Sequence, residues 1–137
     1  MDTYKIEFSD TTHIGGAYDE FHHEIAQIKK FDDGEVKVEF RSKDFFQPME
    51  IVDDHTYLLK FEDGREIKIY GEGENVYMLV GEDKVDVTYP EFNYQSSHGT
   101  YNFTFDDEDN LKLETDSDEI VMAISASLSL MAYLHNH

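Results

Sequence analysis

The sequence predicts a mainly β domain, in which an antiparallel β-barrel or strongly curved sheet encloses a hydrophobic C-terminal α-helix. Three observations lead to this fold class. Short segments of alternating apolar and polar residues recur up to about residue 115. Turn sequences rich in Asp and Gly separate them. The segment from Ile120 to Leu134 then carries no charge, in a chain whose formal net charge is -20, so we expect it to be buried.

Length and composition favour one domain over residues 1–137. A chain of this length can bury a core of its own, and 39% of its residues are hydrophobic, which separates it from disordered acidic tails. The absence of cysteine excludes disulfides and cysteine-ligated metal sites. No basic and apolar leader precedes the strand-like segment Thr3 to Phe8. We therefore expect a soluble, cytoplasmic protein held together by core packing.

The first strands are predicted from a period of two. A strand over residues 3–8 places Tyr4, Ile6 and Phe8 on one face, and residues 36–40 alternate in the same way. Because apolar side chains occupy only one face of each segment, both strands should be half-exposed.

The clearest hairpin surrounds Asp63-Gly64, a dipeptide that supplies the backbone angles of a tight turn. Alternating segments at residues 57–61 and 67–69 flank it. Further strands of the same kind are predicted at residues 76–80, 84–89, 100–105 and 111–114. Many short strands with regular turns predict an antiparallel sandwich or barrel.

Residues 17–30 interrupt the alternation and predict a short amphipathic helix. Their apolar side chains recur at spacings of three and four, which places them on one helical face. These side chains are Tyr18, Phe21, Ile25 and Ile28. A strand through Glu24 to Ile28 is the alternative, because this segment can also alternate.

The last predicted element is a buried helix over residues 118–134. Asp116, Ser117 and Asp118 offer a cap, and Glu119 suits the positive end of the helix dipole. All faces of the helix are apolar or small. Since a membrane-spanning helix needs about 20 apolar residues, we expect no transmembrane segment here. A surrounding sheet can approach the small residues closely.

The chain has many strands, then an acidic helix cap and an apolar final helix. In this order of elements it resembles the tubby C-terminal-like superfamily, which includes the tubby, phospholipid scramblase and LURP-one-related groups. The resemblance is carried by Asp118 to Ala126 and by the hairpin from Phe61 to Ile67. It implies a β-barrel around a hydrophobic C-terminal helix. Tubby proteins bind phosphoinositide headgroups through clustered Lys and Arg. This chain has 11 basic residues against 31 acidic ones, so we expect neither that lipid site nor scramblase activity here.

The acidic composition restricts the partners. Nucleic acids and anionic lipids bind through Lys and Arg, so the sequence predicts neither as a partner and favours a basic protein. The leading function is a non-enzymatic, tubby-like scaffold that acts through protein–protein contact. The alternative is an acidic nucleic-acid mimic that inhibits a partner by occupying its basic site, since spaced carboxylates can imitate phosphates. An acidic surface also keeps a small domain soluble.

The sequence assigns no catalytic, cofactor or metal residue and leans against an enzyme. His22-His23 and Asp53-Asp54-His55 offer metal ligands without a recognised spacing. Ser96-Ser97-His98 lacks an orienting acid nearby, and the acidic run 106–109 lacks the central Gly of a calcium loop. A metal-dependent enzyme is the least favoured alternative.

Aromatic and acidic residues in predicted loops form a candidate contact surface for a protein partner. Loops gather where strands end, and aromatic side chains are common in such contacts. The residues predicted to contact a partner are Phe45, Phe46, Tyr89, Phe92, Tyr94, Asp106, Asp107, Glu108 and Asp109. The alternative is that the aromatics close the barrel ends over the helix.

Overall fold

The structure of the protein, a computed structural model, describes residues 1–9, 14–41 and 44–135. In these ranges the chain forms twelve strands and one helix, α1 (Ile120–His135). The strands are β1 (Asp2–Ser9), β2 (Ile14–Tyr18), β3 (Glu24–Lys30), β4 (Val36–Phe40), β5 (Phe45–Asp53), β6 (Thr56–Lys60), β7 (Glu66–Glu72), β8 (Asn75–Val80), β9 (Asp83–Val87), β10 (Glu91–Ser96), β11 (Gly99–Phe105) and β12 (Leu111–Thr115).

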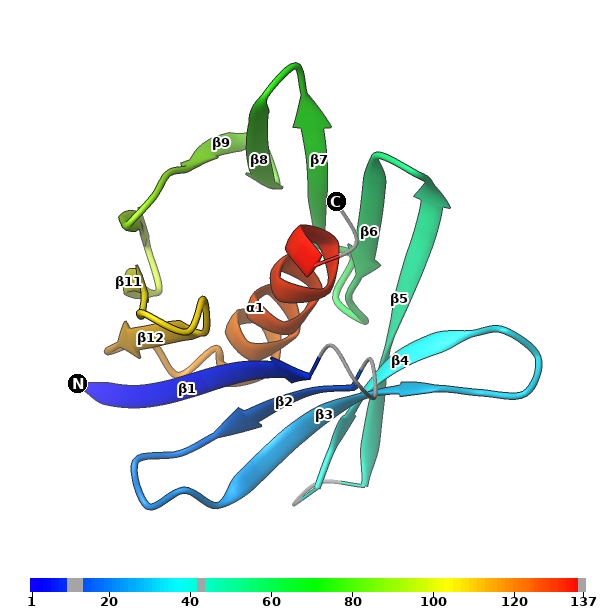
Figure 1. The fold of residues 1–137 in the computed structure, drawn as a ribbon, viewed down its shortest axis with the longest axis horizontal. Coiled ribbons are helices and arrows are strands. Elements are labelled where there is room, and N and C mark those ends of the chain that lie inside the picture. The colour runs from blue at the N-terminus through cyan, green and yellow to red at the C-terminus, as the bar shows by residue number, and fades with distance from the viewer. Residues whose placement is uncertain (10–13, 42–43, 136–137) are drawn as a thin grey trace.

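All strands belong to one antiparallel sheet, with the order β10-β11-β12-β1-β2-β3-β4-β5-β6-β7-β8-β9. Apart from β9 and β10, strands that follow one another in sequence pair with one another, and β1 also pairs with β12, where Asp2 lies opposite Thr115. The sheet curls around α1 to form a nearly closed barrel (Figure 1). The predicted fold class, a mainly β protein whose curved sheet packs around a C-terminal helix, is confirmed.

The sheet is interrupted between β9 and β10, which are consecutive in sequence but form its two edges. Residues 88–90 connect them, and the strands lie near each other without ladder pairing. In the described residues, one side-chain hydrogen bond links the two strands: the hydroxyl of Tyr94 donates to Oδ2 of Asp83, at 2.8 Å. We call this unpaired junction the seam.

Helix α1 lies in the core, and residues 123–133 are buried without interruption. Leu128 packs toward β2, where its Cδ2 atom lies 3.4 Å from the position that a Cβ would take on Gly15. The hydroxyl of Ser127 donates to the carbonyl of Ala123, one turn back, at 2.7 Å. No helix in the described part of the chain has the length and hydropathy that crossing a membrane requires.

The helix begins at Ile120 rather than at residue 118, so Glu119 precedes its first turn. The carbonyl of Glu119 accepts a hydrogen bond from the N–H of Ala123, and Oγ of Ser117 accepts one from the N–H of Glu119. The hydroxyl of Tyr101 donates to the same Oγ at 2.8 Å. The predicted polar start of the helix is therefore anchored to β11.

The prediction of an amphipathic helix over residues 17–30 is wrong. The segment consists of the end of β2, a turn, and β3. The carboxylate of Asp19 holds the turn, because its Oδ1 accepts hydrogen bonds from the N–H groups of Phe21 and His23 at 3.0 and 2.8 Å. Phe21, which the helix would have directed inward, is 74% exposed.

The alternative of a strand through Glu24 to Ile28 is confirmed. In β3 the inward side chains Ala26 and Ile28 are buried, and they lie opposite Phe40 and Val38 of β4. The helical spacing in the sequence came from counting Phe21, which lies in the turn, together with apolar residues of the two strands. Pairing with β2 and β4 supplies the backbone hydrogen bonds that a helix would otherwise have provided.

Candidate functional site

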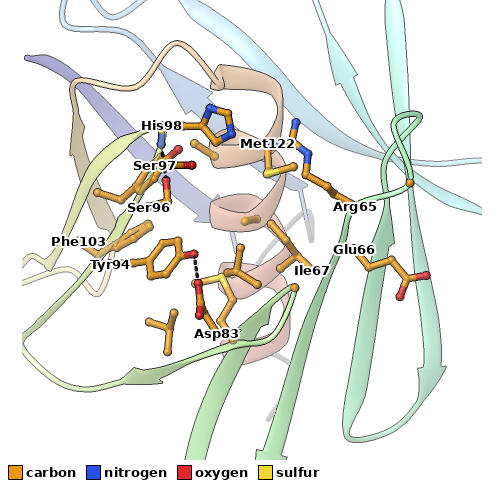
Figure 2. Close-up of a pocket in the computed structure, with 18 residues that line it drawn as sticks. Arg65, Glu66, Ile67, Asp83, Tyr94, Ser96, Ser97, His98, Phe103 and Met122 are labelled. Atoms are coloured by element: carbon orange, nitrogen blue, oxygen red, sulfur yellow. Dashed lines mark hydrogen bonds between the residues drawn. The ribbon is translucent and has the colours of Figure 1, made fainter.

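A cavity of about 480 Å³ lies beside the N-terminal half of α1, next to the seam (Figure 2). We call it the seam cavity. Its apolar wall includes Ile67, Met78, Val85, Phe103, Met122 and Ala126. Its polar rim includes Arg65, Asp83, Tyr94, Ser96, Ser97 and His98.

The strand pattern positions the apolar wall. Met78 of β8 lies opposite Val85 of β9 and also opposite Ile69 of β7, and all three side chains are buried. On the other side of the seam, Phe103 of β11 stacks on Phe92 of β10 with ring centroids 4.5 Å apart. The helix contributes two alanines, Ala123 and Ala126, beside Met122, and the hydrogen-bonded sheet stops at the seam. These two features leave the space unfilled.

Three turns form the polar rim at the end of the barrel where α1 begins. They are the β6–β7 turn with Arg65, the β8–β9 turn with Gly81, and the β10–β11 turn with His98. The side chain of His98 is 50% exposed, so the rim reaches solvent. Figure 2 shows Arg65 and His98 on opposite sides of the start of the helix.

Arg65 joins its own turn to the start of the helix through ion pairs. Its Nε donates to Oδ2 of Asp63 at 2.6 Å, while Nη1 and Nη2 donate to the two carboxylate oxygens of Glu119 at 3.1 and 3.2 Å. The Asp63 hydrogen bond, followed by that of Glu119, raises the pKa of Arg65. The hydrogen bond from Arg65 lowers the pKa of Glu119. The guanidinium charge is therefore already compensated.

Asp83 and Tyr94 meet across the seam at the cavity wall (Figure 2). Burial, and then the hydrogen bond to Asp83, raise the pKa of Tyr94 to about 12. Its ring stacks on that of Tyr101, with centroids 6.0 Å apart. Lys84, the next residue after Asp83, forms its ion pair with Glu72 at 3.9 Å. No ion pair to Asp83 is present among the described residues.

The structure supplies an acid that sequence reasoning did not find for His98. Oε1 of Glu119 lies 3.4 Å from Nδ1 of His98, although the two residues are distant in sequence. The hydroxyl oxygen of Ser96 accepts a hydrogen bond from the backbone N–H of His98 at 3.1 Å. In the described hydrogen bonds no seryl hydroxyl contacts the imidazole, so a nucleophile and base are not assembled.

The predicted partner-contact residues occupy different environments. Tyr89 is 62% exposed, and its hydroxyl donates to the Asp109 carboxylate, which places it against the exposed acidic turn 106–109. Phe92 is buried, whereas Tyr94 lines the seam cavity. The aromatics of β5 lie apart from this group: Phe45 is partly buried, and Phe46, which is 38% exposed, packs against Phe31. Partner contact through these residues stays a prediction.

The two histidine-containing segments do not assemble a metal site. Nδ1 of His23 lies 3.6 Å from Oδ2 of Asp19, while His22 stacks on Tyr18. Oδ1 of Asp53 accepts a hydrogen bond from the backbone N–H of His55. Within residues 1–9, 14–41 and 44–135, no three His, Asp or Glu side chains are grouped so that they could hold a metal ion.

Sequence reasoning did not identify Arg65, Asp83 or Glu119 as site residues. They come from three separated segments, and only folding brings them to one end of the barrel. The sequence carried only a weak signal for the cavity: one face of the helix has alanines, whereas its other faces have large side chains.

In comparisons with known proteins, the chain matches no protein-family model, no curated protein and no solved structure.

Proposed function

We propose that this protein is a non-enzymatic binding domain that holds a small molecule with an apolar body in the seam cavity. The cavity itself carries this proposal. Ligand sites are usually concave spaces of about 300–1,000 Å³, lined by apolar side chains with a few polar groups that orient the ligand. The seam cavity, at about 480 Å³, has this size and this distribution of side chains.

Two features of the wall support uptake of a ligand. Met78 and Met122 both line the cavity, and methionine side chains adapt readily to the shape of a bound molecule. The wall also ends at the seam, where side chains rather than a backbone ladder connect β9 to β10. Local opening of the seam therefore requires the loss of few hydrogen bonds.

A tryptophan reporter tests the site, because the chain contains no tryptophan. Phe103→Trp places the reporter in the cavity wall, and Phe21→Trp, on the exposed β2–β3 turn, is the matched control. We expect N-phenyl-1-naphthylamine, a neutral apolar dye, to bind saturably and to quench the emission of Trp only in the Phe103→Trp variant. Equal quenching of both variants, or no saturable binding, would contradict the proposal.

A second candidate function is contact with a basic protein partner through the acidic exterior. The charge of -20 and the exposed acidic turn beside Tyr89 favour it. Asp107→Asn with Glu108→Gln should weaken capture of basic proteins at low salt, whereas Glu72→Gln with Glu74→Gln should not. Competition by DNA would favour the nucleic-acid mimic over a general scaffold. Equal capture by both double variants would exclude this turn as the contact.

We also propose that the chain has the tubby-like fold. Support comes from the C-terminal helix inside a nearly closed antiparallel barrel, which is the arrangement that the resemblance of the sequence implies. The shared fold by itself assigns no ligand.

A further inference from the structure

We propose that the ligand of the seam cavity is an organic ammonium ion, a primary amine with an apolar body, whose ammonium group binds to Asp83. This inference rests on the proposed function, because it names the class of small molecule that the cavity takes up.

The positive charge of Arg65 is already neutralised by neighbouring carboxylates, which disfavours an anionic ligand. Three of its nitrogen atoms already donate to carboxylates, with a bidentate pair to Glu119 and a third hydrogen bond to Asp63. A ligand carboxylate would compete with these two acids for a positive charge that they already neutralise. The net charge of the chain, -20, also repels anions from the cavity mouth and attracts cations.

Asp83 supplies an acceptor for a cation. Its Oδ2 accepts the hydroxyl hydrogen of Tyr94, and in the described residues neither of its carboxylate oxygens forms an ion pair. The neighbouring ammonium group of Lys84 lies elsewhere, 4.0 Å from the centroid of the Tyr77 ring and 3.9 Å from Oε2 of Glu72. A ligand ammonium group would therefore meet a carboxylate without displacing a lysine or an arginine.

The aromatic rings of the cavity wall suit the same class of ligand. Tyr94, Tyr101 and Phe103 all line the cavity, and Figure 2 shows Tyr94 and Phe103 on the side where Asp83 lies. The faces of aromatic rings attract cations, most strongly when water is excluded. A carboxylate with adjacent aromatic rings thus recognises an ammonium group through two interactions that a neutral alcohol cannot fully replace.

The rest of the ligand should be apolar. Across the cavity from the aromatic side lie Ile67 of β7 and Met122 of the helix (Figure 2). Burying one methylene group strengthens binding by a factor of about four. Affinity should consequently rise with the length of an alkyl chain until the cavity is filled.

Isothermal titration with three ligands of equal chain length tests the proposal at neutral pH and physiological salt. Octylamine is cationic, octan-1-ol is neutral and octanoate is anionic. We expect octylamine to bind most tightly, octan-1-ol about tenfold more weakly, as for the loss of a charged hydrogen bond, and octanoate most weakly.

Two variants locate the amine preference. Asp83→Asn should remove the preference for octylamine over octan-1-ol and leave octan-1-ol affinity within about twofold, because the amide keeps the shape of the side chain. Asp86→Asn, on the same strand but outside the residues that line the seam cavity, removes the same formal charge and should preserve the preference. Thermal unfolding of both variants confirms that they are folded, and the wild-type ligand series tests the preference for an ammonium group without any variant.

The outcomes separate the two proposals. If octan-1-ol and octanoate bind as tightly as octylamine, or if Asp86→Asn abolishes the preference as fully as Asp83→Asn, the cavity binds small molecules but the ammonium assignment is wrong. If none of the three ligands binds, the proposed function is overturned as well.

Discussion

The barrel has two junctions that differ in how they are closed. At the first, β1 pairs with β12 through a backbone ladder, although these strands come from opposite ends of the chain. Ile6, Leu111 and Leu113 are fully buried behind it. At the seam, β9 and β10 are neighbours in sequence, yet only a side-chain hydrogen bond joins them in the described residues. The junction with the greater separation in sequence is the more completely closed.

This difference indicates how the fold combines stability with a cavity. Pairing between the chain ends fixes the curvature of the sheet and packs it against one side of α1. The opposite side of the helix, with Met122, Ala123 and Ala126, faces the seam, where the wall is incomplete. A ligand site can therefore exist without interrupting the ladder between the chain ends.

The largest predicted effect comes from a charge placed in the closed side of the core. Leu128→Asp should abolish folding, because this side chain is fully buried against β2 and a buried carboxylate without a partner costs several kcal/mol. Circular dichroism and urea unfolding measure the loss. Leu134→Asp, at the partly buried end of the helix, is the control and should remain folded. Cooperative unfolding of a soluble Leu128→Asp variant would contradict the enclosure of α1.

Enlarging an alanine tests the two sides directly. Ala17→Leu, at a fully buried position of β2, should lower the free energy of unfolding by about 1–3 kcal/mol, because the core there has no room for the larger side chain. Ala126→Leu projects into the seam cavity and should change stability by less than about 1 kcal/mol, since it fills existing space. It should also abolish binding of the neutral dye. Equal destabilisation by the two changes would show that the sides do not differ in packing.

The sequence predicted those elements whose signal is local. Alternation and Asp-Gly turns identified the hairpin around Gly64, which has a φ of 91°, and strands such as β4 and β12. Strand β2 was missed because Gly15 and Gly16 suggest a turn rather than a strand. In the fold, Gly15 allows close approach of Phe8 and Leu128, which is a long-range requirement.

Strand β5 was missed for a different reason. Gln47 occupies a core position and interrupts the apolar pattern, since its amide is buried and donates to the carbonyls of Pro48 and Lys60. In β10, Phe92 and Tyr94 alternate but were interpreted as loop aromatics. Neither strand can be identified without knowing which neighbours supply its hydrogen bonds.

The candidate site was not predictable, because its parts converge only in the fold. Arg65 and His98 lie in two separate turns, Asp83 begins β9, and Glu119 reaches Arg65 and His98 from the start of the helix. Which charges neutralise one another also depends on the fold: Arg65 is one of two arginines in a highly acidic chain, and it pairs with the carboxylates of Asp63 and Glu119. Composition reports the net charge and does not show which charge lacks a partner.

A smaller effect is expected from opening the seam itself. Tyr94→Phe removes the hydrogen bond to Asp83 and should lower the free energy of unfolding at neutral pH by about 0.5–1.5 kcal/mol. Tyr89→Phe, which removes a hydrogen bond to Asp109 outside the seam, is the matched control. Dye binding should become faster in Tyr94→Phe only. Equal binding rates in both variants would argue against the seam as the entrance.

The same bond has a pH signature. The folded-state pKa of Tyr94, about 12, lies above its ordinary value of 10.0, so its contribution is complete below pH 10 and is lost as the pH rises toward 12. The stability difference between wild type and Tyr94→Phe should therefore shrink over this range. Urea unfolding at a series of alkaline pH values measures it. A difference that stays constant to pH 12 would contradict the proposed role of the hydroxyl.

The smallest effect on stability should come from Glu119→Gln, which weakens a partly exposed ion pair with Arg65. We expect a loss of about 0.5–1 kcal/mol at neutral pH. The pKa of Glu119 is lowered in the folded state, so its contribution is present above its ordinary value of 4.5 and is lost as the pH falls through the folded value. The difference between wild type and Glu119→Gln in urea unfolding should therefore vanish in acid. Glu72→Gln, on the exposed Lys84 pair, is the control.

Glu119→Gln also tests why the seam cavity should reject anions. Loss of the carboxylate leaves Nη1 of Arg65 without an anionic partner, while Asp63 still holds Nε and Nη2. Octanoate affinity should then rise several-fold, and octan-1-ol affinity should stay unchanged, because the apolar wall is intact. If octanoate binds no better to Glu119→Gln than to Glu72→Gln, compensation of Arg65 does not set the charge preference. The field of the whole acidic chain would then be the remaining cause.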